Sequence, residues 1–381
     1  MKRRHPSPFV LFAILALCTA TVAGAFQSAL AVPAAVCRYE AAVGLPSWIT
    51  TGIWNNGKLL VVDVVNRKLV QISRRGVPEE LRTALGELLA GTGMTRIWPG
   101  LQGKDGQPQP IVEFAGGKLL SLDRSLAPRR KIEMSTTELR SGDRQLTNLI
   151  DWVLSGDGKD VIGYADLTGP VQEGRYRWKN AFVRFNLDRP DSFSIIHERL
   201  FPDDARMGMN LPYPLMTSIG STAYVALIDG QMRLWRFGPQ DTELQPLPMR
   251  AFPAHLQGKL APMLPNSMVW EDAPAIMETV AQSEMPAGLY AWENSLYLLS
   301  RRLEKNQRQW FLSKIDPVEE ELLWTVRVPS SAHHLTVIPG PEEWAFLEKG
   351  PAAAHLNQIT HHIRFVSSAQ LRSESLKSLC K

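Results

Sequence analysis

The sequence lacks the compact motifs that mark many enzyme active sites. It has no G-x-S-x-G nucleophile elbow, no Walker loop, no H-E-x-x-H, no G-x-G-x-x-G after a strand and no C-x-x-C. The absence of C-x-x-C-H also excludes covalent haem attachment of the c type. These absences exclude motif-defined hydrolases, nucleotide-binding enzymes and zinc proteases. They leave sites that are assembled from single residues of distant segments.

An excess of charge of one sign is also absent. The formal net charge of +4 comes from 42 basic and 38 acidic residues, and three of the basic residues lie within the first four positions. Without those three the balance is nearly neutral, and no long block of like charge occurs. The sequence therefore has no electrostatic footprint for nucleic acid, and it contains no low-complexity tract.

The first 31 residues are typical of a signal peptide. A basic start at 2–4 precedes a short apolar stretch at 9–17, and the A-L-A sequence at 29–31 fits a cleavage site before Val32. An uncleaved membrane anchor is the alternative, but about 20 apolar residues are needed to cross a bilayer. We therefore expect a secreted or periplasmic protein whose mature domain, 32–381, has no transmembrane segment.

Cysteine is scarce, with three residues in the chain. Cys18 lies in the leader, where the large Leu17 before it departs from a lipidation box. Cys37 and Cys380 lie at opposite ends of the mature chain, in a compartment that permits disulfides. We expect them to form a bridge that closes the domain as one loop, which the chain-entropy estimate values at more than about 4.7 kcal/mol. Two unpaired thiols are the alternative.

Six short apolar runs recur along the chain, each after a turn-rich segment. The clearest pair is 57–63 and 117–123, which share five of seven residues, and weaker echoes follow at 161–166, 223–229, 295–299 and 343–347. Most are followed by a second run that alternates with period two, as half-buried strands do, at 68–72, 181–185, 232–237, 309–315 and 360–366.

Strand pairs in series predict a β-propeller of six blades. Asp229-Gly230 lies between two of the runs and is a type I′ hairpin signal. Six compact blades would use about 240–270 residues, which leaves room for irregular stretches at 77–93, 168–178, 239–265 and 271–288. A seven-bladed ring is the alternative. Because the ends of a closed ring are adjacent, the fold also agrees with a bridge between the terminal cysteines.

One short inter-blade helix is predicted near residues 78–90. Pro78 suits the first turn, and Glu79 and Glu80 complement the positive end of the helix dipole. An apolar face follows and ends at Gly91; it is formed by Leu81, Leu85, Leu88 and Leu89. The predicted fold is therefore all-β with this one helix, in a single domain that we expect to be monomeric.

Residues 57–72 resemble a known propeller repeat. Asp63 and Asn66 are similar to the Asp-x-x-Asn-x-Arg pattern of the NHL-type six-bladed propellers, with Lys68 where that family has arginine. In that family these polar residues brace a strand turn. The resemblance therefore implies a six-bladed propeller and a structural role for Asp63 and Asn66.

Two loop segments are the candidate binding surface. Residues 169–178 combine arginine with aromatic side chains, a composition enriched at interfaces, and 270–288 carry carboxylates beside a tryptophan. Long loops on a rigid scaffold often carry binding residues. A hairpin tip and a solvated loop are the alternative interpretations. The candidate binding residues are Arg175, Tyr176, Trp178, Trp270, Glu271 and Asp272.

Five of the eight histidines lie between positions 333 and 362. Three converging imidazoles could hold a zinc ion, and the candidates are His334, His355 and His362. Neighbouring histidines on a strand point to opposite faces, so at most one member of each adjacent pair could face such a site. A set of structural histidines is the simpler interpretation.

The sequence favours a non-catalytic binding or scaffold protein of the cell envelope that holds a protein, a peptide or a glycan on one face of the ring. One alternative is a metal-dependent hydrolase of the lactonase kind with a divalent cation over the channel, and another is a quinone-dependent oxidoreductase. No cofactor is indicated otherwise. The eleven tryptophans are spread along the chain, which indicates packing between blades rather than a sugar platform.

The export and disulfide predictions are tested together by mass spectrometry of protein purified from the cell envelope. We expect a chain that begins at Val32 and whose Cys37 and Cys380 react with an alkylating reagent only after reduction. A chain that keeps its first residues, or thiols that react without reductant, would contradict one prediction or the other.

Overall fold

The structure is a computed structural model that describes residues 40–43, 51–63, 68–73, 78–80, 94–102, 108–114, 118–133, 140–155, 160–168, 178–187, 189–200, 214–228, 231–259, 283–304, 307–328, 330–349 and 361–368. Its elements are strands, together with one short 3-10 helix, η1 (Met249–Ala251). Within these ranges, no helix is long and apolar enough to cross a membrane.

The strands form six sheets, which are termed blades 1 to 6 in the order in which they follow along the chain. Blade 1 contains β2 (Gly52–Asn55), β3 (Lys58–Asp63), β4 (Lys68–Ile72) and β5 (Pro78–Glu80). Blade 2 contains β6 (Met94–Gln102), β7 (Pro108–Phe114), β8 (Lys118–Leu122) and β9 (Pro128–Glu133). Blade 3 contains β10 (Arg140–Ser141), β11 (Arg144–Leu154), β12 (Asp160–Thr168), β13 (Trp178–Asn186) and β14 (Arg189–Leu200), and one bridge between Arg140 and Ser192 closes this sheet on itself.

The second half of the chain repeats the arrangement. Blade 4 contains β15 (Leu215–Ile219), β16 (Thr222–Ile228), β17 (Gln231–Phe237) and β18 (Gln245–Pro246). Blade 5 contains β19 (Met285–Trp292), β20 (Ser295–Glu304), β21 (Gln307–Asp316) and β22 (Glu321–Val328). Blade 6 contains β23 (His334–Ile338), β24 (Glu343–Lys349), β25 (His361–Ser367) and, from the other end of the chain, β1 (Glu40–Val43).

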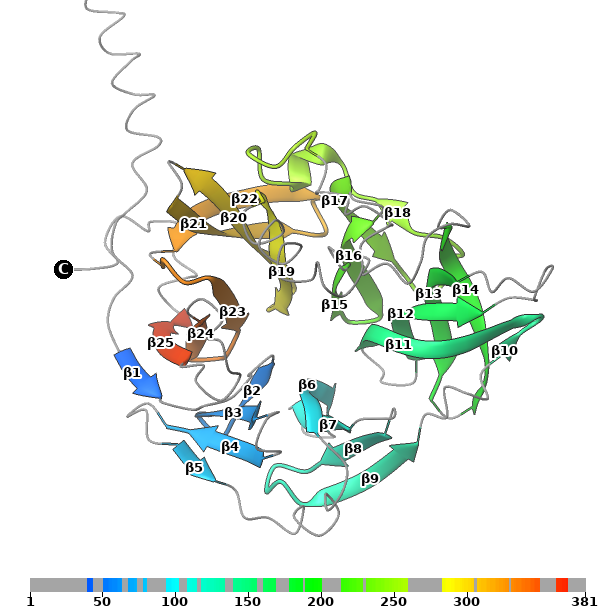
Figure 1. Ribbon diagram of the computed structural model, residues 1–381, viewed down its shortest axis with the longest axis horizontal. Coiled ribbons are helices and arrows are strands. Elements are labelled where there is room, and N and C mark those ends of the chain that lie inside the picture. Colours follow the sequence, from blue (N-terminus) through cyan, green and yellow to red (C-terminus); the bar gives the residue numbers. More distant parts are fainter. Residues whose placement is uncertain are drawn as a thin grey trace, which may run out of the picture.

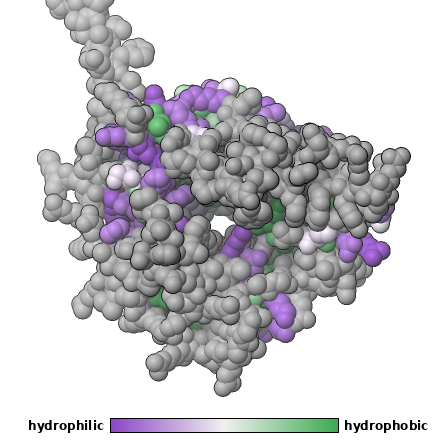
Figure 2. Space-filling model, viewed as in Figure 1, coloured by the Kyte–Doolittle hydropathy of each residue, from purple (hydrophilic) through white to green (hydrophobic). Residues whose placement is uncertain are grey.

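The six sheets are arranged as blades around a central opening (Figure 1, Figure 2). The first long strand of each blade lies innermost, and these strands contact one another around the ring: β2 contacts β6 and β23, β15 contacts β11 and β19, and β19 contacts β23. A hydrogen bond from Arg96 of β6 to Asp151 of β11 completes the circle. The prediction of an all-β, six-bladed propeller is confirmed.

Blade 6 closes the ring by combining strands from both ends of the chain. β1 pairs antiparallel with β25, with Glu40 opposite Arg364 and Val43 opposite His361. The first and last described strands thus lie in one sheet. Cys37 and Cys380 lie outside the described residues, as does the leader, so the disulfide and the signal peptide stay predictions.

β3 shows why the strands in the middle of a blade appear in the sequence as continuous apolar runs. Leu60 and Val62 pack against blade 2, whereas Leu59 and Val61 pack against blade 6. Successive side chains alternate between the two faces of a sheet, and a propeller covers both faces of each blade, so both sets are apolar. Burying each such side chain stabilises the fold by about 1.5–3 kcal/mol.

Three tryptophans pack between blades, as predicted. Trp152 lies in the core between blades 2 and 3, and Trp310 and Trp344 lie in the core between blades 5 and 6. Each is 1% exposed. Trp344 meets the ring of Tyr297 edge-on, with the ring centroids 4.6 Å apart. Such aromatic pairs add about 0.5–1.5 kcal/mol beyond the area that they bury.

The recurring apolar runs are all strands, but the run in blade 2 is not equivalent to the others. Five of the six apolar runs belong to the second strands of their blades, namely β3, β12, β16, β20 and β24. The run at 117–123 contains β8, which is the third strand of blade 2, whose second strand is β7. The close similarity of 57–63 and 117–123 therefore does not mark equivalent positions. A glycine turn followed by a buried strand recurs at any hairpin.

The predicted helix near residues 78–90 does not begin where the sequence suggested. Pro78–Glu80 form β5, which pairs with β4 at the outer edge of blade 1. An edge strand tolerates proline because one of its sides has no partner that needs an N–H donor. A proline and two glutamates that suit a helix start therefore also suit this strand. Residues 81–93 lie outside the described residues.

Two turns predicted from the sequence adjoin strands that the structure describes. Ile228 of β16 pairs with Gln231 of β17, as a two-residue hairpin at Asp229-Gly230 requires. Asp63 is 2% exposed at the end of β3. Its partner in the repeat-like pattern, Asn66, lies outside the described residues.

The predicted irregular stretch 239–265 is described up to residue 259. Phe252 and Leu256 are buried with Leu298 and Ile315 of blade 5. Gln257 holds the segment by donating from its amide to the carbonyl of Phe252 at 2.7 Å. The segment is therefore a wedge in the core between blades 4 and 5 rather than an open loop.

Gly340 gives a test of the contact between blades 6 and 1. The Trp54 indole N–H donates to the carbonyl of Ile338 at 3.2 Å, and a Cβ atom at Gly340 would overlap the Trp54 ring and the carbonyl of Glu343. We expect Gly340→Ala to lower the free energy of unfolding by about 1–3 kcal/mol, as overpacking does, measured by urea denaturation. Val318→Ala, at a side chain that is 79% exposed, is the control. Equal stability of the Gly340→Ala variant and the wild type would contradict this tight closure.

Candidate functional site

The two faces of the ring differ in what they carry. Each blade has four antiparallel main strands, so the chain enters and leaves a blade on the same face of the ring. This side is termed the connecting face: innermost strands begin there and second strands end there. The opposite face carries the hairpins between first and second strands. Binding residues tend to lie in connections that a rigid scaffold holds, so the connecting face, which carries the connections between blades, is the candidate functional face.

The described residues that flank the two candidate binding segments lie on the connecting face. Trp178 begins β13 on this side of blade 3. Lys259 and Ser283, which flank residues 260–282, lie on the same side, where Lys259 forms an ion pair with Glu284 next to the start of β19. The other candidates lie outside the described residues; they are Arg175, Tyr176, Trp270, Glu271 and Asp272.

The structure separates two of the three histidines proposed as metal ligands. His334 lies opposite Lys349, whereas His362 lies opposite Glu348. Lys349 and Glu348 are neighbours on β24, so the two histidines belong to opposite faces of the sheet. His355 lies outside the described residues. In the part of the chain that the structure describes, no group of three His, Cys, Asp or Glu side chains is placed to hold a metal ion.

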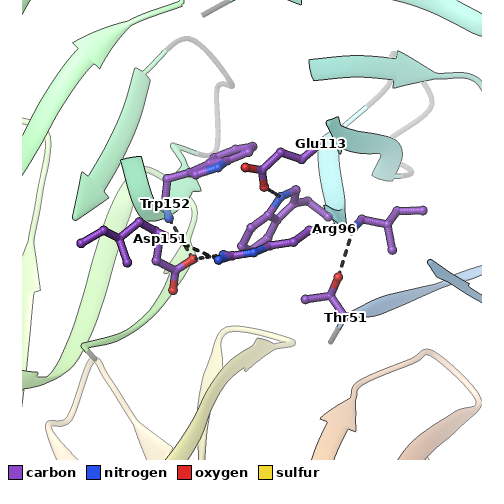
Figure 3. Close-up of polar contacts among 8 residues, drawn as sticks. Thr51, Arg96, Glu113, Asp151 and Trp152 are labelled. Carbon is purple, nitrogen blue, oxygen red and sulfur yellow. Dashed lines mark hydrogen bonds and ion pairs between the residues drawn. The ribbon is translucent and has the colours of Figure 1, made fainter. Parts of the chain in front are cut away.

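A cluster of charged and aromatic side chains lies where the inner strands of blades 2 and 3 meet (Figure 3). Arg96 donates from Nη1 to Oδ1 of Asp151 at 2.7 Å and from Nη2 to the carbonyl of Ile150 at 2.9 Å. The backbone N–H of Trp152 donates to the same carboxylate oxygen at 2.9 Å. The ion pair thus joins the two inner strands.

Glu113 lies beside this ion pair and between aromatic rings. It is opposite Arg96 in the register of β6 and β7, and its Oε2 accepts a hydrogen bond from the indole of Trp98 at 3.2 Å. Trp98 packs on Trp152 with ring centroids 4.9 Å apart. The Arg96 guanidinium carbon lies 5.6 Å from the centre of the Trp98 ring, a cation–π contact.

Burial raises the pKa of both carboxyl groups in the cluster. For Glu113, loss of solvation outweighs the lowering effect of Arg96 and of the indoles of Trp98 and Trp152 on the pKa. For Asp151, loss of solvation likewise outweighs the effect of Arg96 and of the Trp152 backbone N–H on the pKa. The Asp151 side chain is still 26% exposed because it lies on an innermost strand. Both groups therefore hold protons more readily than ordinary carboxyl groups.

The indole of Trp152 completes the surroundings of Glu113. Figure 3 shows it beside the Glu113 carboxylate. Its Nε1 is buried and has no hydrogen-bond partner among the described residues, yet its N–H dipole lowers the pKa of Glu113. Chemically, a carboxyl group with a raised pKa can exchange a proton with a ligand. Structurally, the contacts of this cluster hold blade 2 against blade 3. The ion pair between Arg96 and Asp151 is sufficient for that structural role.

A shallow groove on blade 3 is lined by Asp160, Arg184 and Asn186, among others. Asn186 donates to Oδ1 of Asp160 at 2.9 Å. Arg184 donates to the carbonyls of Pro239 at 2.8 Å and of Gly238 at 3.2 Å, in the segment that follows β17. These hydrogen bonds hold blade 3 against blade 4. A structural role therefore accounts for the polar residues that line the groove.

Sequence analysis did not single out the residues of the blade 2–blade 3 cluster. Arg96, Glu113 and Asp151 lie on three strands, and none belongs to a motif. Their one detectable signal is a charged residue within a largely apolar strand, since charged side chains are seldom buried unless they are paired.

Comparison with known proteins adds only general likenesses. No protein-family model matches the chain, and no curated protein matches it in sequence. Among solved structures, virginiamycin B lyase from Staphylococcus aureus is 11% identical with a TM-score of 0.38, covering 86% of this chain and 98% of that one. A protein of unknown function from Bacteroides thetaiotaomicron is 10% identical with a TM-score of 0.44, covering 87% and 73%. A chain of a nidogen–laminin complex is 11% identical with a TM-score of 0.39, covering 74% and 81%.

The raised pKa of Glu113 predicts a pH dependence of stability. The folded state binds its proton more tightly than the unfolded state, so stability falls as pH rises from the ordinary glutamate range through the raised pKa. Glu113→Gln removes this contribution while keeping an acceptor for Trp98. We expect a smaller loss of unfolding free energy between acidic and neutral pH, measured by urea denaturation at several pH values.

The control for this experiment is Glu321→Gln at the exposed start of β22. It should follow the pH dependence of the wild type. If Glu113→Gln also keeps the wild-type dependence, the Glu113 carboxyl group is not held in the environment described.

Proposed function

We propose that the protein is an exported binding protein of the cell envelope that holds a protein, a peptide or a glycan on the connecting face of its ring. The observation that carries the proposal is the placement of the candidate segments. The described residues that flank the two segments all lie on the connecting face: Thr168 and Trp178 on blade 3, and Lys259 and Ser283 beside the start of β19. Segments far apart in sequence can therefore contribute to a single surface.

The rigidity of the ring supports this proposal. Each blade is packed on both sides, and polar contacts such as that between Arg96 and Asp151 fix neighbouring blades to one another. A surface that is held in place before binding loses little conformational freedom on binding, and this saves free energy. A rigid scaffold that carries long connections suits recognition of a large partner.

The contacts of the blade 2–blade 3 cluster also agree with a scaffold. Arg96 bonds to a carboxylate and a carbonyl of the next blade, and Glu113 accepts from an indole. Both side chains therefore have structural tasks. The lactonase-like hydrolase and the quinone-dependent oxidoreductase stay predictions from the sequence, which no specific observation favours over binding.

Site-specific cross-linking in the cell envelope tests which face holds the partner. Gln307 begins β21 and is exposed on the connecting face, whereas Val318 lies in the turn after β21 ends and is exposed on the opposite face. A photo-crosslinking amino acid placed at Gln307 should give a discrete adduct, identified by mass spectrometry. The same amino acid placed at Val318 should give none.

The two positions flank the same strand and lie on opposite faces of the ring, so each serves as the control for the other. An adduct from Val318 alone would show that the opposite face is the binding surface. No adduct from either position would contradict the binding function.

A further inference from the structure

The hairpin between β2 and β3 carries an Asn-Gly dipeptide at its tip. Asn55 pairs with Lys58, so Asn56 and Gly57 form a two-residue loop on the opposite face of the ring. Their φ angles are 50° and 71°, in the left-handed region that a type I′ turn requires. In the whole sequence, asparagine is followed directly by glycine only at this position.

The backbone nitrogen of Gly57 is open to approach. Asn56 and Gly57 are both exposed. The N–H of Gly57 has no hydrogen-bond partner in the part of the chain that the structure describes. A Cβ atom built on Gly57 would have nothing within 4 Å. No neighbouring atom therefore shields this nitrogen from the Asn56 side chain.

One weak contact holds the Asn56 side chain. Its Nδ2 donates to the carbonyl of Arg124 at 3.4 Å, which is long for a hydrogen bond. The Nδ2 of Asn55 donates to the same carbonyl at 3.3 Å, but Asn55 is 8% exposed and is fixed in the strand pairing. Release of the Asn56 amide therefore costs little, because Asn55 keeps the hairpin of blade 1 in contact with the turn between β8 and β9.

We propose that Asn56 is a deamidation site at which the side-chain amide is converted to a carboxylate. The nitrogen of Gly57 loses its proton and bonds to Cγ of Asn56, while the bond from Cγ to Nδ2 breaks and ammonia leaves. Water then opens the resulting cyclic imide at either of its two carbonyls, which gives aspartate or isoaspartate. The net change replaces an amino group with a hydroxyl group, and it needs water but no oxidant or reductant.

Glycine favours this reaction for two reasons. It has no side chain that would obstruct attack by its own nitrogen. Its backbone also reaches conformations that are closed to other residues, so the loop can bend toward the geometry of the cyclic imide. The same freedom that makes Asn-Gly a good type I′ turn thus makes this turn chemically reactive.

Deamidation would weaken the contact between blades 1 and 2. A carboxylate at position 56 has no N–H to donate to the carbonyl of Arg124. Isoaspartate also adds a carbon atom to the main chain, so the loop no longer has the two-residue geometry that fits the pair of Asn55 and Lys58. The innermost strand of blade 1 would be loosened at this end.

Incubation of the folded mature chain in mildly alkaline buffer tests the proposal, with deamidation followed by mass spectrometry of peptides. Asn294 is the internal control: it is exposed in the hairpin between β19 and β20 and has a φ of 59°, but Ser295 follows it and pairs with Trp292. We expect Asn56 to convert at least about tenfold faster than Asn294, which corresponds to a barrier lower by about 1.4 kcal/mol.

A pair of variants assigns the effect to Gly57. Gly57→Asp should slow the conversion of Asn56, because the new side chain obstructs the nitrogen while aspartate still tolerates a left-handed φ. The matched control is Gly220→Asp, at a glycine with a φ of 54° and open surroundings in the hairpin between β15 and β16. Asn56 should convert in this variant at the wild-type rate.

The same chain unfolded in urea gives the rate of the dipeptide without the turn. The proposal is overturned if Asn56 converts in urea but stays intact in the folded chain, since the turn would then prevent the attack. Equal rates at Asn56 and Asn294 in the folded chain would overturn it as well. No partner takes part in these measurements, so their outcome is independent of the cross-linking experiment.

Discussion

The pairing of β1 with β25 is the constraint on which the rest of the ring depends. A blade buries two apolar faces, and each face needs a neighbouring blade to cover it. Leu59 and Val61 of blade 1 are covered by residues of blade 6 that include Ala345 and Leu347. If the ring opened there, both faces would meet water, and the hydrophobic free energy of the whole junction would be lost. One short strand from the start of the chain therefore secures both the first blade and the last.

Local sequence patterns were sufficient to predict most of this architecture. Period-two alternation and paired apolar runs located β3, β12, β16, β20 and β24, because strand formation in a doubly covered sheet depends on the residues of the strand itself. β7 was missed because Pro108 and Pro110 interrupt its pattern. β5 was assigned to a helix because Pro78, Glu79 and Glu80 satisfy the preferences of a helix start, and only pairing with β4 decides the matter.

The candidate sites were much less predictable, because their members meet only through the closure of the ring. Arg96 and Asp151 belong to different blades, and neither residue suggests the other. His334 was singled out, but for a metal site, since sequence alone placed it with other histidines. The structure places it instead with Arg301, Arg308 and Lys349, whose common location follows from the ends of β20, β21 and β24. Non-local charge clusters of this kind leave no periodic signal.

The orientation of β1 against β25 also has a mechanical consequence. The chain before Glu40 and the chain after Ser367 leave the sheet at the same end, because the two strands are antiparallel and Glu40 lies opposite Arg364. Tension between the two termini would therefore separate these strands one residue pair at a time, as a zipper opens. It would not shear all the pairs at once. A covalent link between the ends would carry that force in place of the hydrogen bonds, so the ring would keep its shape under load.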